Sequence, residues 1–343
     1  MLIADDDPDG DWTAPGVYRC APGVHRIPLP LPNDGLRAVN VYAVADAGGW
    51  TLIDSGWALT EARDLLAAAL GALDAGLSDV RRFLVTHLHR DHYTQAIALR
   101  RELGVPIALG RGEQPGLAAI LDPAAVPVGA QLQQLRRAGA DALADEIAGF
   151  GNEGSAPFYE EPDVWLDDGA EIAVGADRRL RAVATPGHTR GHLVYADDDA
   201  GLLFAGDHVL PRITPSIGFE PAPPASPLAD FLTSLQLIRA RPDAALLPAH
   251  GAVGMRVHQR IDELLAHHGH RLDATLAAVR AGRTTAHEVA RALTWTRRDR
   301  RLDELDPFNR MLATLETAAH LAVLAERGAL RTTERDGVRH YED

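Results

Sequence analysis

Residues 86–92 read Thr-His-Leu-His-Arg-Asp-His and directly follow the apolar, β-branched run RRFLV at 81–85. Such a run favours a strand, and alternation at the end of a strand sends His87 and His89 to the same side. The turn that follows can bring Asp91 and His92 back toward a second position. Four side chains that bind metals thus fall within six residues. This density favours a site for two metal ions over a solvated polar surface.

Three further candidate ligands follow other apolar runs, each within Gly or Pro turn chemistry. They are His188 in ATPGHTRGH, Asp207 in LLFAGDHVL and His250 in ALLPAHG. Loops at the ends of strands are where binding and catalytic residues concentrate. We therefore expect these three side chains to join the cluster from 86–92.

The composition limits which ligands a metal can have. Cys20 is the single cysteine, whereas the chain has 15 histidines, so a metal here must use imidazoles and carboxylates. Neutral imidazoles and carboxylates suit Zn²⁺, and Mn²⁺ or iron stays open as an alternative. Seven ligands leave room for a bridging water. We expect two divalent metal ions, with zinc first among the candidates.

Strands and helices alternate around these motifs. Short runs at 37–46 and 50–54, split by Gly48-Gly49, predict a hairpin, and Leu and Ala at helical spacing predict a helix over 60–74. Further strands are expected at 81–87, 105–110, 180–185, 192–197, 202–205 and 244–248. The pattern indicates an α/β layered body.

The length of 343 residues suggests two units. We assign residues 1–256 to a catalytic domain, with a helical insert at about 111–162 and a proline-rich loop at 211–227 that lies over a pocket. Residues 257–343 carry helical patterns at 257–281, 284–294 and 307–328. The Asp336-Gly337 turn signal then predicts a terminal hairpin. Three helices and a hairpin favour a small winged-helix-like domain.

The ordered motifs resemble the metallo-β-lactamase superfamily. They are Asp54, THLHRDH at 86–92, PGH at 186–188, GD at 206–207 and AHG at 249–251. The resemblance implies an αββα sandwich with the site on one edge. With its C-terminal segment, the chain also resembles a branch that includes lactamase-β-like endoribonucleases and hydroxyacylglutathione-hydrolase-like proteins. No cysteine lies near the motifs, which argues against the subgroup of true β-lactamases that uses one.

The resemblance also implies a role for each ligand. His87, His89 and His188 would bind one metal, and Asp91, His92 and His250 the other. Asp207 would bridge the two metals, and Asp54 would lie behind the ligands. Asp91, Asp207 and Asp54 are the residues that we expect to matter most for catalysis.

The expected reaction is hydrolysis by a metal-bound hydroxide. Two divalent ions carry more positive charge than two carboxylates and a hydroxide, so the site stabilises a developing oxyanion. A thiolate or alkoxide leaves more easily than an amine, which must first be protonated. We expect an ester or thioester substrate, as in acyl-thioesterases. A lactonase, an endoribonuclease or phosphodiesterase, and a non-catalytic metal-binding protein are the alternatives.

The charge and hydropathy of the chain disfavour nucleic acid and membranes as binding partners. The net charge of −14 disfavours nucleic acid, and the expected helix over 306–327 carries Asp306, Glu316 and Glu326 against Arg310 and Arg327. No apolar run approaches the roughly 18 residues that cross a bilayer. The acidic start lacks the basic segment of a secretory signal. We expect a cytoplasmic protein that has a frayed N-terminus and acts on a small molecule. A homodimer is possible, and the sequence does not decide the oligomeric state.

Overall fold

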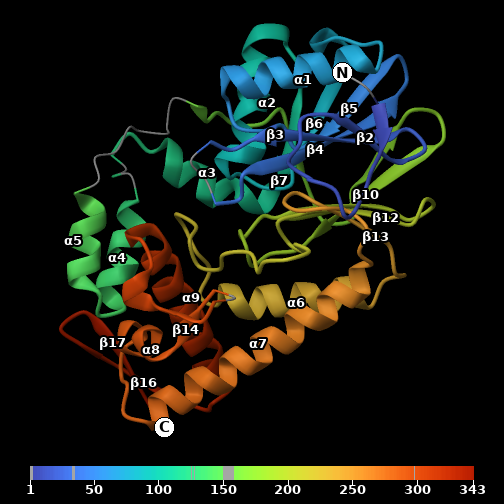
Figure 1. Cartoon of the computed structure of the whole chain (residues 1–343). Coiled ribbons are helices and arrows are strands. Elements are labelled where there is room, and N and C mark those ends of the chain that lie inside the picture. The colour runs from blue at the N-terminus through green and yellow to red at the C-terminus, as the bar shows by residue number, and fades with distance from the viewer. Residues whose placement is uncertain (1–2, 33–34, 125, 127, 150–157, 297) are drawn as a thin grey trace.

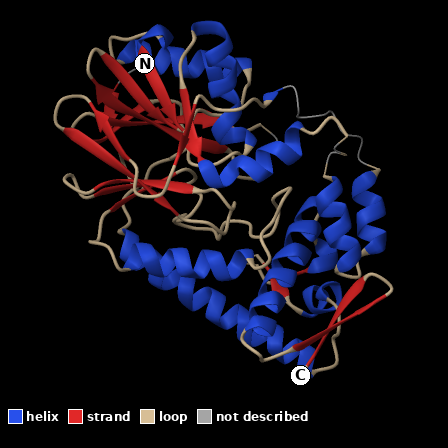
Figure 2. Cartoon of the chain, turned by 180° about the vertical axis from the view of Figure 1, so that it is seen from behind, coloured by secondary structure: helices blue, strands red, loops and turns tan. Residues whose placement is uncertain are grey.

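Two β-sheets stack face to face, and helices cover both outer faces (Figures 1 and 2). The computed structural model describes residues 3–32, 35–124, 126, 128–149, 158–296 and 298–343. The α/β class and the αββα sandwich expected from the resemblance are confirmed. In the described part of the chain, no helix has the length and hydropathy needed to span a membrane.

Among the described residues, the first sheet has eight strands in the order β1 to β8. The strands β2 to β5 pair antiparallel, whereas β5 to β8 pair parallel. Their bounds are β1 Ile3–Asp5, β2 Val17–Ala21, β3 Val24–Pro30, β4 Ala38–Asp46, β5 Gly49–Ile53, β6 Val80–Leu84, β7 Ile107–Gly110 and β8 Val164–Leu166. Helices α1 (Thr60–Ala72) and α2 (Arg90–Leu103) cover its outer face through a core that includes Leu66, Phe83 and Ile97.

The second sheet has five strands in the order β13-β12-β11-β10-β9. Only β12 and β13 run parallel in this sheet as described. The bounds are β9 Glu171–Val174, β10 Arg178–Ala184, β11 Leu193–Asp197, β12 Leu202–Gly206 and β13 Ala245–Pro248. Helices α6 (Pro227–Arg239) and α7 (Val257–Arg280) cover its outer face (Figure 1).

A layer of apolar side chains joins the two sheets. Tyr42 of β4 meets Phe204 of β12 edge to face, with ring centroids 5.4 Å apart. Leu180 and Tyr195 from the second sheet are buried in the same layer. Burial of one large apolar side chain contributes roughly 1.5–3 kcal/mol, so this layer fixes how the sheets sit relative to each other. That placement positions the ends of the strands, where the candidate ligands lie.

Helices α4, α5, α8 and α9 form one body at the side of the sandwich, whereas α3 packs against the core of the first sheet. Their bounds are α3 Gln114–Leu121, α4 Gly129–Arg137, α5 Asp141–Ala148, α8 Ala286–Ala292 and α9 Pro307–Glu326. Helix α9 packs against α4, α5, α6, α7 and α8, and the apolar cluster of the second sheet continues through α6 and α7 into α8 and α9. Helices α4 and α5 of the insert thus pack onto the C-terminal helices.

Two hairpins complete the C-terminal part. Strands β14 (Thr294–Trp295) and β15 (Arg300–Arg301) form the first. Strands β16 (Arg331–Arg335) and β17 (Val338–Glu342) form the second, around Asp336 and Gly337 with φ of 51° and 79°. The order of helices and terminal hairpin follows the prediction. The winged-helix assignment and the division at residue 256 remain predictions.

The N-terminal segment departs from the prediction. A frayed start was expected, but β1 pairs parallel with β2, and the Asp6 carboxylate accepts from Arg26 Nε at 2.6 Å in a buried ion pair. The Arg26 guanidinium needs a partner once buried, and Asp6 supplies it. Helix α6, which follows the proline-rich loop, was not predicted either.

Candidate metal centre

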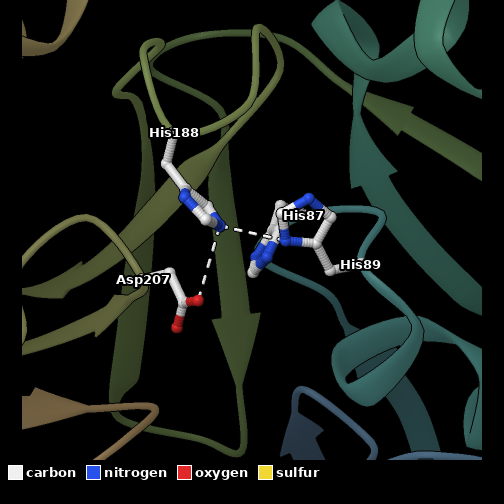
Figure 3. Close-up of side chains that lie close together, drawn as sticks. All are labelled: His87, His89, His188 and Asp207. Carbon is white, nitrogen blue, oxygen red and sulfur yellow. Dashed lines mark hydrogen bonds and ion pairs between the residues drawn. The ribbon is translucent and has the colours of Figure 1, made fainter. Parts of the chain in front are cut away.

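The candidate ligands lie where strands of both sheets end. Strand β6 ends at Leu84, His87 and His89 lie in the connection that follows, and Asp91 and His92 occupy the first turn of α2. The other three ligands follow strands of the second sheet: His188 follows β10, Asp207 follows β12 and His250 follows β13. Figure 3 shows side chains of the two sheets facing one another.

The seven candidates form two adjoining groups. The ligand atoms of His87, His89, His188 and Asp207 lie within 4.8 Å of one another. Those of a second set, Asp91, His92 and His250, do the same. All seven side chains that the sequence singled out as ligands are thus brought together.

Asp207 lies between the two groups and faces both. Its Oδ2 lies 3.4 Å from Nε2 of His188, in the first group. Its Oδ1 lies 3.3 Å from Nε2 of His250 and 3.6 Å from Nε2 of His92, in the second group. One carboxylate therefore offers one oxygen to each group, which is the geometry that a bridging ligand needs.

The separations between ligand atoms fit metal ions. Zinc bonds of about 2.0–2.1 Å in a tetrahedral site place neighbouring ligand atoms roughly 3.3 Å apart. His188 Nε2 lies 3.0 Å from His89 Nδ1, as Figure 3 marks. Asp91 Oδ2 lies 3.4 Å from His250 Nε2 and 3.5 Å from His92 Nε2.

Buried polar atoms at the centre lack partners. Among the described residues, the Nε2 atoms of His87, His92 and His250 and Oδ1 of Asp207 have no hydrogen-bond partner. Unpaired buried polar groups are costly, on the order of 1–3 kcal/mol each. Their convergence on one place fits cations bound between them.

In four of the histidines, the ring nitrogen that faces away from the centre contacts a polar group of the protein. His92 Nδ1 lies 2.9 Å from Asp54 Oδ2, and His87 Nδ1 lies 3.0 Å from Thr86 Oγ1. In the same way, His188 Nδ1 donates to the Ser216 carbonyl and His250 Nδ1 to the Ala38 carbonyl, both at 2.8 Å. A proton fixed on Nδ1 leaves the lone pair on Nε2, which is the form that binds a metal.

The two groups differ in charge. Burial lowers the pKa of His89 to about 3 and the pKa of His188 to about 4, so both imidazoles are neutral. Burial also acts to lower the pKa of His92, but the carboxylates of Asp91, Asp54 and Asp207 outweigh it and raise that pKa to about 10. The second group therefore attracts a cation strongly.

Two backbone positions hold the carboxylates in place. Asp54 has a φ of 59°, a left-handed conformation that Asp and Asn adopt more readily than most residues. Gly206, before Asp207, has a φ of 50°, and a Cβ there would lie 2.7 Å from His192 Nε2 and 2.8 Å from the Thr86 side chain. Only glycine fits this turn.

The structure adds residues that the sequence reasoning missed. His192 Nε2 accepts from the Asp207 main-chain N–H at 3.2 Å. The sequence signal for His192 was that it lies in the same motif as His188, ATPGHTRGH. Buried Glu113 accepts from Thr189 Oγ1, and buried Glu220 accepts from the Arg190 main-chain N–H at 3.0 Å. These contacts hold the turn that carries His188.

Aromatic side chains border the centre. Phe219 of the proline-rich loop lies with its ring centroid 6.4 Å from that of His89. Phe308, at the start of α9, lies 5.6 Å from Phe219 and is 50% exposed. The C-terminal part thus contributes an apolar side chain to the surroundings of the centre.

Comparison with known proteins identifies related chains. The model of the Metallo-beta-lactamase superfamily matches residues 34–250. The lactamase-like protein nscB of Aspergillus fumigatus is 26% identical over 80% of this chain and 71% of its own length. An atrochrysone carboxyl ACP thioesterase of that fungus is 25% identical over 79% of this chain, which spans half of that protein's length. A hydroxyacylglutathione hydrolase of Acidiphilium cryptum is 26% identical over 65% of this chain and 71% of its own.

Two solved structures resemble nearly the whole chain. A beta-lactamase domain protein from Burkholderia ambifaria has a TM-score of 0.80 and 27% identity over 98% of this chain and 97% of its own. A metallo-beta-lactamase family protein from Thermus thermophilus has a TM-score of 0.77 and 29% identity over 94% of this chain and 99% of its own. The first likeness extends beyond residue 250 into the C-terminal helices.

Proposed function

The chain belongs to the metallo-beta-lactamase superfamily, and on that premise we propose that it is a dinuclear metal-dependent hydrolase of a thioester or ester. His87, His89 and His188 would hold one metal, and Asp91, His92 and His250 the other. Asp207, which offers one oxygen to each group, is the observation that carries this proposal. When bound, two divalent ions would polarise the substrate carbonyl and lower the pKa of water. Zinc is the metal that we propose first.

The side chains behind the ligands orient them. Asp54 Oδ2 accepts the Nδ1 proton of His92 and keeps Nε2 free for a metal. Such carboxylate–histidine pairs also raise the basicity of the ligand. Asp54 is therefore a positioning residue, while Asp91 and Asp207 would contact the metals directly.

The arrangement of the histidines favours a substrate with a good leaving group. His87, His92, His188 and His250 each hold one ring nitrogen in a second contact and turn the other toward the centre. In the described part of the site, none of these four rings is left over as a general acid. A thiolate leaves without prior protonation, whereas an amine does not. Two of the relatives, a thioesterase and a hydroxyacylglutathione hydrolase, support the same substrate class.

The aromatic border suggests an apolar acyl group. Phe219 and Phe308 form an edge-to-face pair next to His89. We propose that this pair binds the acyl portion, because binding sites are lined mostly by apolar and aromatic side chains. Replacement of Phe308 by Ala should then raise KM for long-chain acyl thioesters more than for acetyl thioesters. This variant is a better test than truncation, because the C-terminal helices share an apolar core with the second sheet.

Nucleic acid is the weaker candidate. In a winged helix, one helix enters the major groove with exposed side chains, but α9 packs against five other helices and buries much of its length. The net charge of −14 also opposes binding to phosphates. Arg297 of the basic run at 297–301 lies outside the described residues, while Arg298, Arg300 and Arg301 are exposed. An RNA substrate therefore enters the experiment as the contrasting outcome.

The experiment compares substrates side by side. Zinc-loaded protein is assayed on acyl thioesters, an aryl ester, a lactone and a single-stranded RNA, with and without a chelator. We expect chelator-sensitive cleavage of the thioesters and intact RNA. Asp207→Ala should be inactive, while Asp262→Asn, at an exposed ion pair with Arg239, should behave as wild type. RNA cleavage without thioester cleavage would reject the proposal.

A further inference from the structure

A third group of metal-binding side chains lies outside the centre, between helices α7 and α9. The ligand atoms of His268, Glu316 and His320 all lie within 4.8 Å of one another. Phe231 of α6 borders the group, with its ring centroid 5.5 Å from that of His268. His268 and His320 are almost completely buried, whereas Glu316 is partly exposed. The group therefore has a buried interior and one side that faces solvent.

The spacing of the three side chains suits a metal ion. Glu316 and His320 are four residues apart on α9, so they lie on the same face of the helix. His268 of α7 approaches them from the opposite side, and its Nδ1 lies 3.2 Å from His320 Nε2. This separation is close to the roughly 3.3 Å between neighbouring ligands of a tetrahedral zinc ion. Two imidazoles and one carboxylate are also a ligand set that zinc accepts.

The protonation of the two rings leaves a buried nitrogen unpaired. His320 Nδ1 lies 2.8 Å from the Glu316 carbonyl oxygen and must donate to it, so His320 Nε2 carries a lone pair. That lone pair faces His268 Nδ1. Among the described residues, the other ring nitrogen of His268, Nε2, has no hydrogen-bond partner. Without a metal, His268 Nδ1 can donate to that lone pair, so the nitrogen that stays unpaired is His268 Nε2; a metal would take the place of the shared proton between the two facing nitrogens.

The charges near His268, Glu316 and His320 also allow a cation to bind there. Burial raises the pKa of Glu316, and the positive charge of Arg271, which also acts on His268 and His320, partly offsets this rise. The Arg271 guanidinium itself lies over the Trp295 ring and donates to the Thr294 carbonyl. In the described part of the chain, the Glu316 carboxylate makes no salt bridge within 4.0 Å. Burial lowers the pKa of His268 to about 2 and the pKa of His320 to about 4, so both imidazoles are neutral and can act as ligands.

We propose that His268, Glu316 and His320 bind a third divalent metal ion of the zinc class, which fastens α7 to α9. Three protein ligands leave one coordination position for water on the side of Glu316. The ion would bind only where α7 and α9 are packed together, so it stabilises the folded chain. This site is built from different elements than the dinuclear centre and stands independently of the proposed hydrolysis.

The test counts metal ions rather than activity. Metal-free protein is loaded with Zn²⁺ or Co²⁺ and desalted, and its metal content is measured by elemental analysis. We expect His320→Gln to bind one equivalent less than wild type. The matched control is His270→Gln, because His270 is an exposed histidine on the same helix α7; it should bind as much as wild type. Far-UV circular dichroism checks that each variant is folded.

Two further variants keep the test decisive. Glu316→Gln changes a partly exposed side chain and should lose the same equivalent, so it replaces His320→Gln if that variant does not fold. Asp207→Ala impairs the dinuclear centre, so any rise in Tm that metal still causes in this variant would come from the third site. The double variant Asp207→Ala/His320→Gln should bind one equivalent less than Asp207→Ala and should lose that rise in Tm. Equal metal content in wild type, His320→Gln and Glu316→Gln would overturn the proposal.

Discussion

Replacement of Asp54 by Asn should weaken metal binding without unfolding the protein. Asn tolerates the left-handed conformation of residue 54, whose φ is 59°. The substitution keeps the shape of the side chain but replaces one carboxylate oxygen with an NH₂ group. Asp54 uses both oxygens: Oδ1 accepts from the Thr86 main-chain N–H at 2.8 Å, and Oδ2 lies 2.9 Å from His92 Nδ1. An amide can accept only one of these two protons, because its other group is a donor.

Each orientation of the amide has a cost. If its oxygen stays on the Thr86 N–H, its NH₂ group donates to His92 Nδ1. The His92 proton then moves to Nε2, which faces Asp91 and Asp207 and would have to bind the metal. In the opposite orientation, the amide oxygen accepts from His92 Nδ1, but the NH₂ group then faces the main-chain N–H of Thr86. Both are donors, so a buried donor is left without a partner. Loss of such an outer-shell contact typically lowers metal affinity about 10- to 100-fold, or roughly 1.4–2.7 kcal/mol.

The assay is a competition between the protein and a chelator of known affinity, monitored with Co²⁺ or Zn²⁺. We expect one of the two dissociation constants, that of the group containing His92, to rise about 10- to 100-fold in Asp54→Asn. The other constant should change less, because His188 is held by the Ser216 carbonyl and Asp54 acts on His87 indirectly, through Thr86 Oγ1. Asp262→Asn serves as the control for an Asp to Asn change at an exposed ion pair. Wild-type values for both constants in folded Asp54→Asn would refute the assigned role of Asp54.

Three further predictions test neighbouring parts of the same centre. Asp207→Ala should lose metal and reduce kcat by at least about 100-fold with an unchanged circular dichroism spectrum, because both groups lose an oxygen; two equivalents of retained metal would contradict the bridge. Gly206→Ala should lower the free energy of unfolding by on the order of 2–4 kcal/mol, because its Cβ would lie 2.7 Å from His192 Nε2 at a φ of 50°; a wild-type urea midpoint would show that the turn adapts. Burial raises the pKa of Glu113 from 4.5 to about 8, so the contribution of this group to the stability of wild type should fall as pH rises from about 4.5 to 8. Glu113→Gln keeps an acceptor for Thr189 but cannot ionise. In chelator-treated protein, its free energy of unfolding minus that of wild type should therefore increase as the pH rises over that range. A difference that does not depend on pH would contradict the raised pKa of Glu113.

The local parts of this site were accessible from the sequence. The ligands follow short apolar runs, and turn chemistry after a strand is a local property. The strand expected over 81–87 was too long, because β6 ends at Leu84, so His87 and His89 come together in the connection and not by alternation along a strand. The helix predicted over 60–74 is observed as α1 at Thr60–Ala72, and the helix predicted over 257–281 is observed as α7 at Val257–Arg280. The Asp336-Gly337 hairpin lies where its turn signal placed it. For the two helices, the pattern extends over enough residues for periodicity to outweigh tertiary effects; for the hairpin, the two-residue turn signal is itself local.

Contacts made through the main chain could not be predicted in the same way. His188 and His250 donate to the carbonyls of Ser216 and Ala38, and a carbonyl is present at every residue. Ser216 lies 28 positions from His188, and Ala38 lies 212 positions from His250. The buried pair of Asp6 and Arg26 was missed for a related reason, because an acidic segment looks solvated until its partner is known. These contacts depend on tertiary placement, which no local pattern records.

The position of the ligands also couples metal binding to the packing of the sandwich. The first sheet and α2 supply His87, His89, Asp91 and His92, whereas the second sheet supplies His188, Asp207 and His250. Each of the two groups therefore contains side chains from both sheets, and a metal in either group would join them. The unpaired Nε2 atoms of His87, His92 and His250 and Oδ1 of Asp207 lie at this edge, and the contact of Tyr42 with Phe204 also joins the two sheets. Cations bound between these atoms would give them partners only when the two sheets are packed together, so metal binding and close packing of the sheets should reinforce each other.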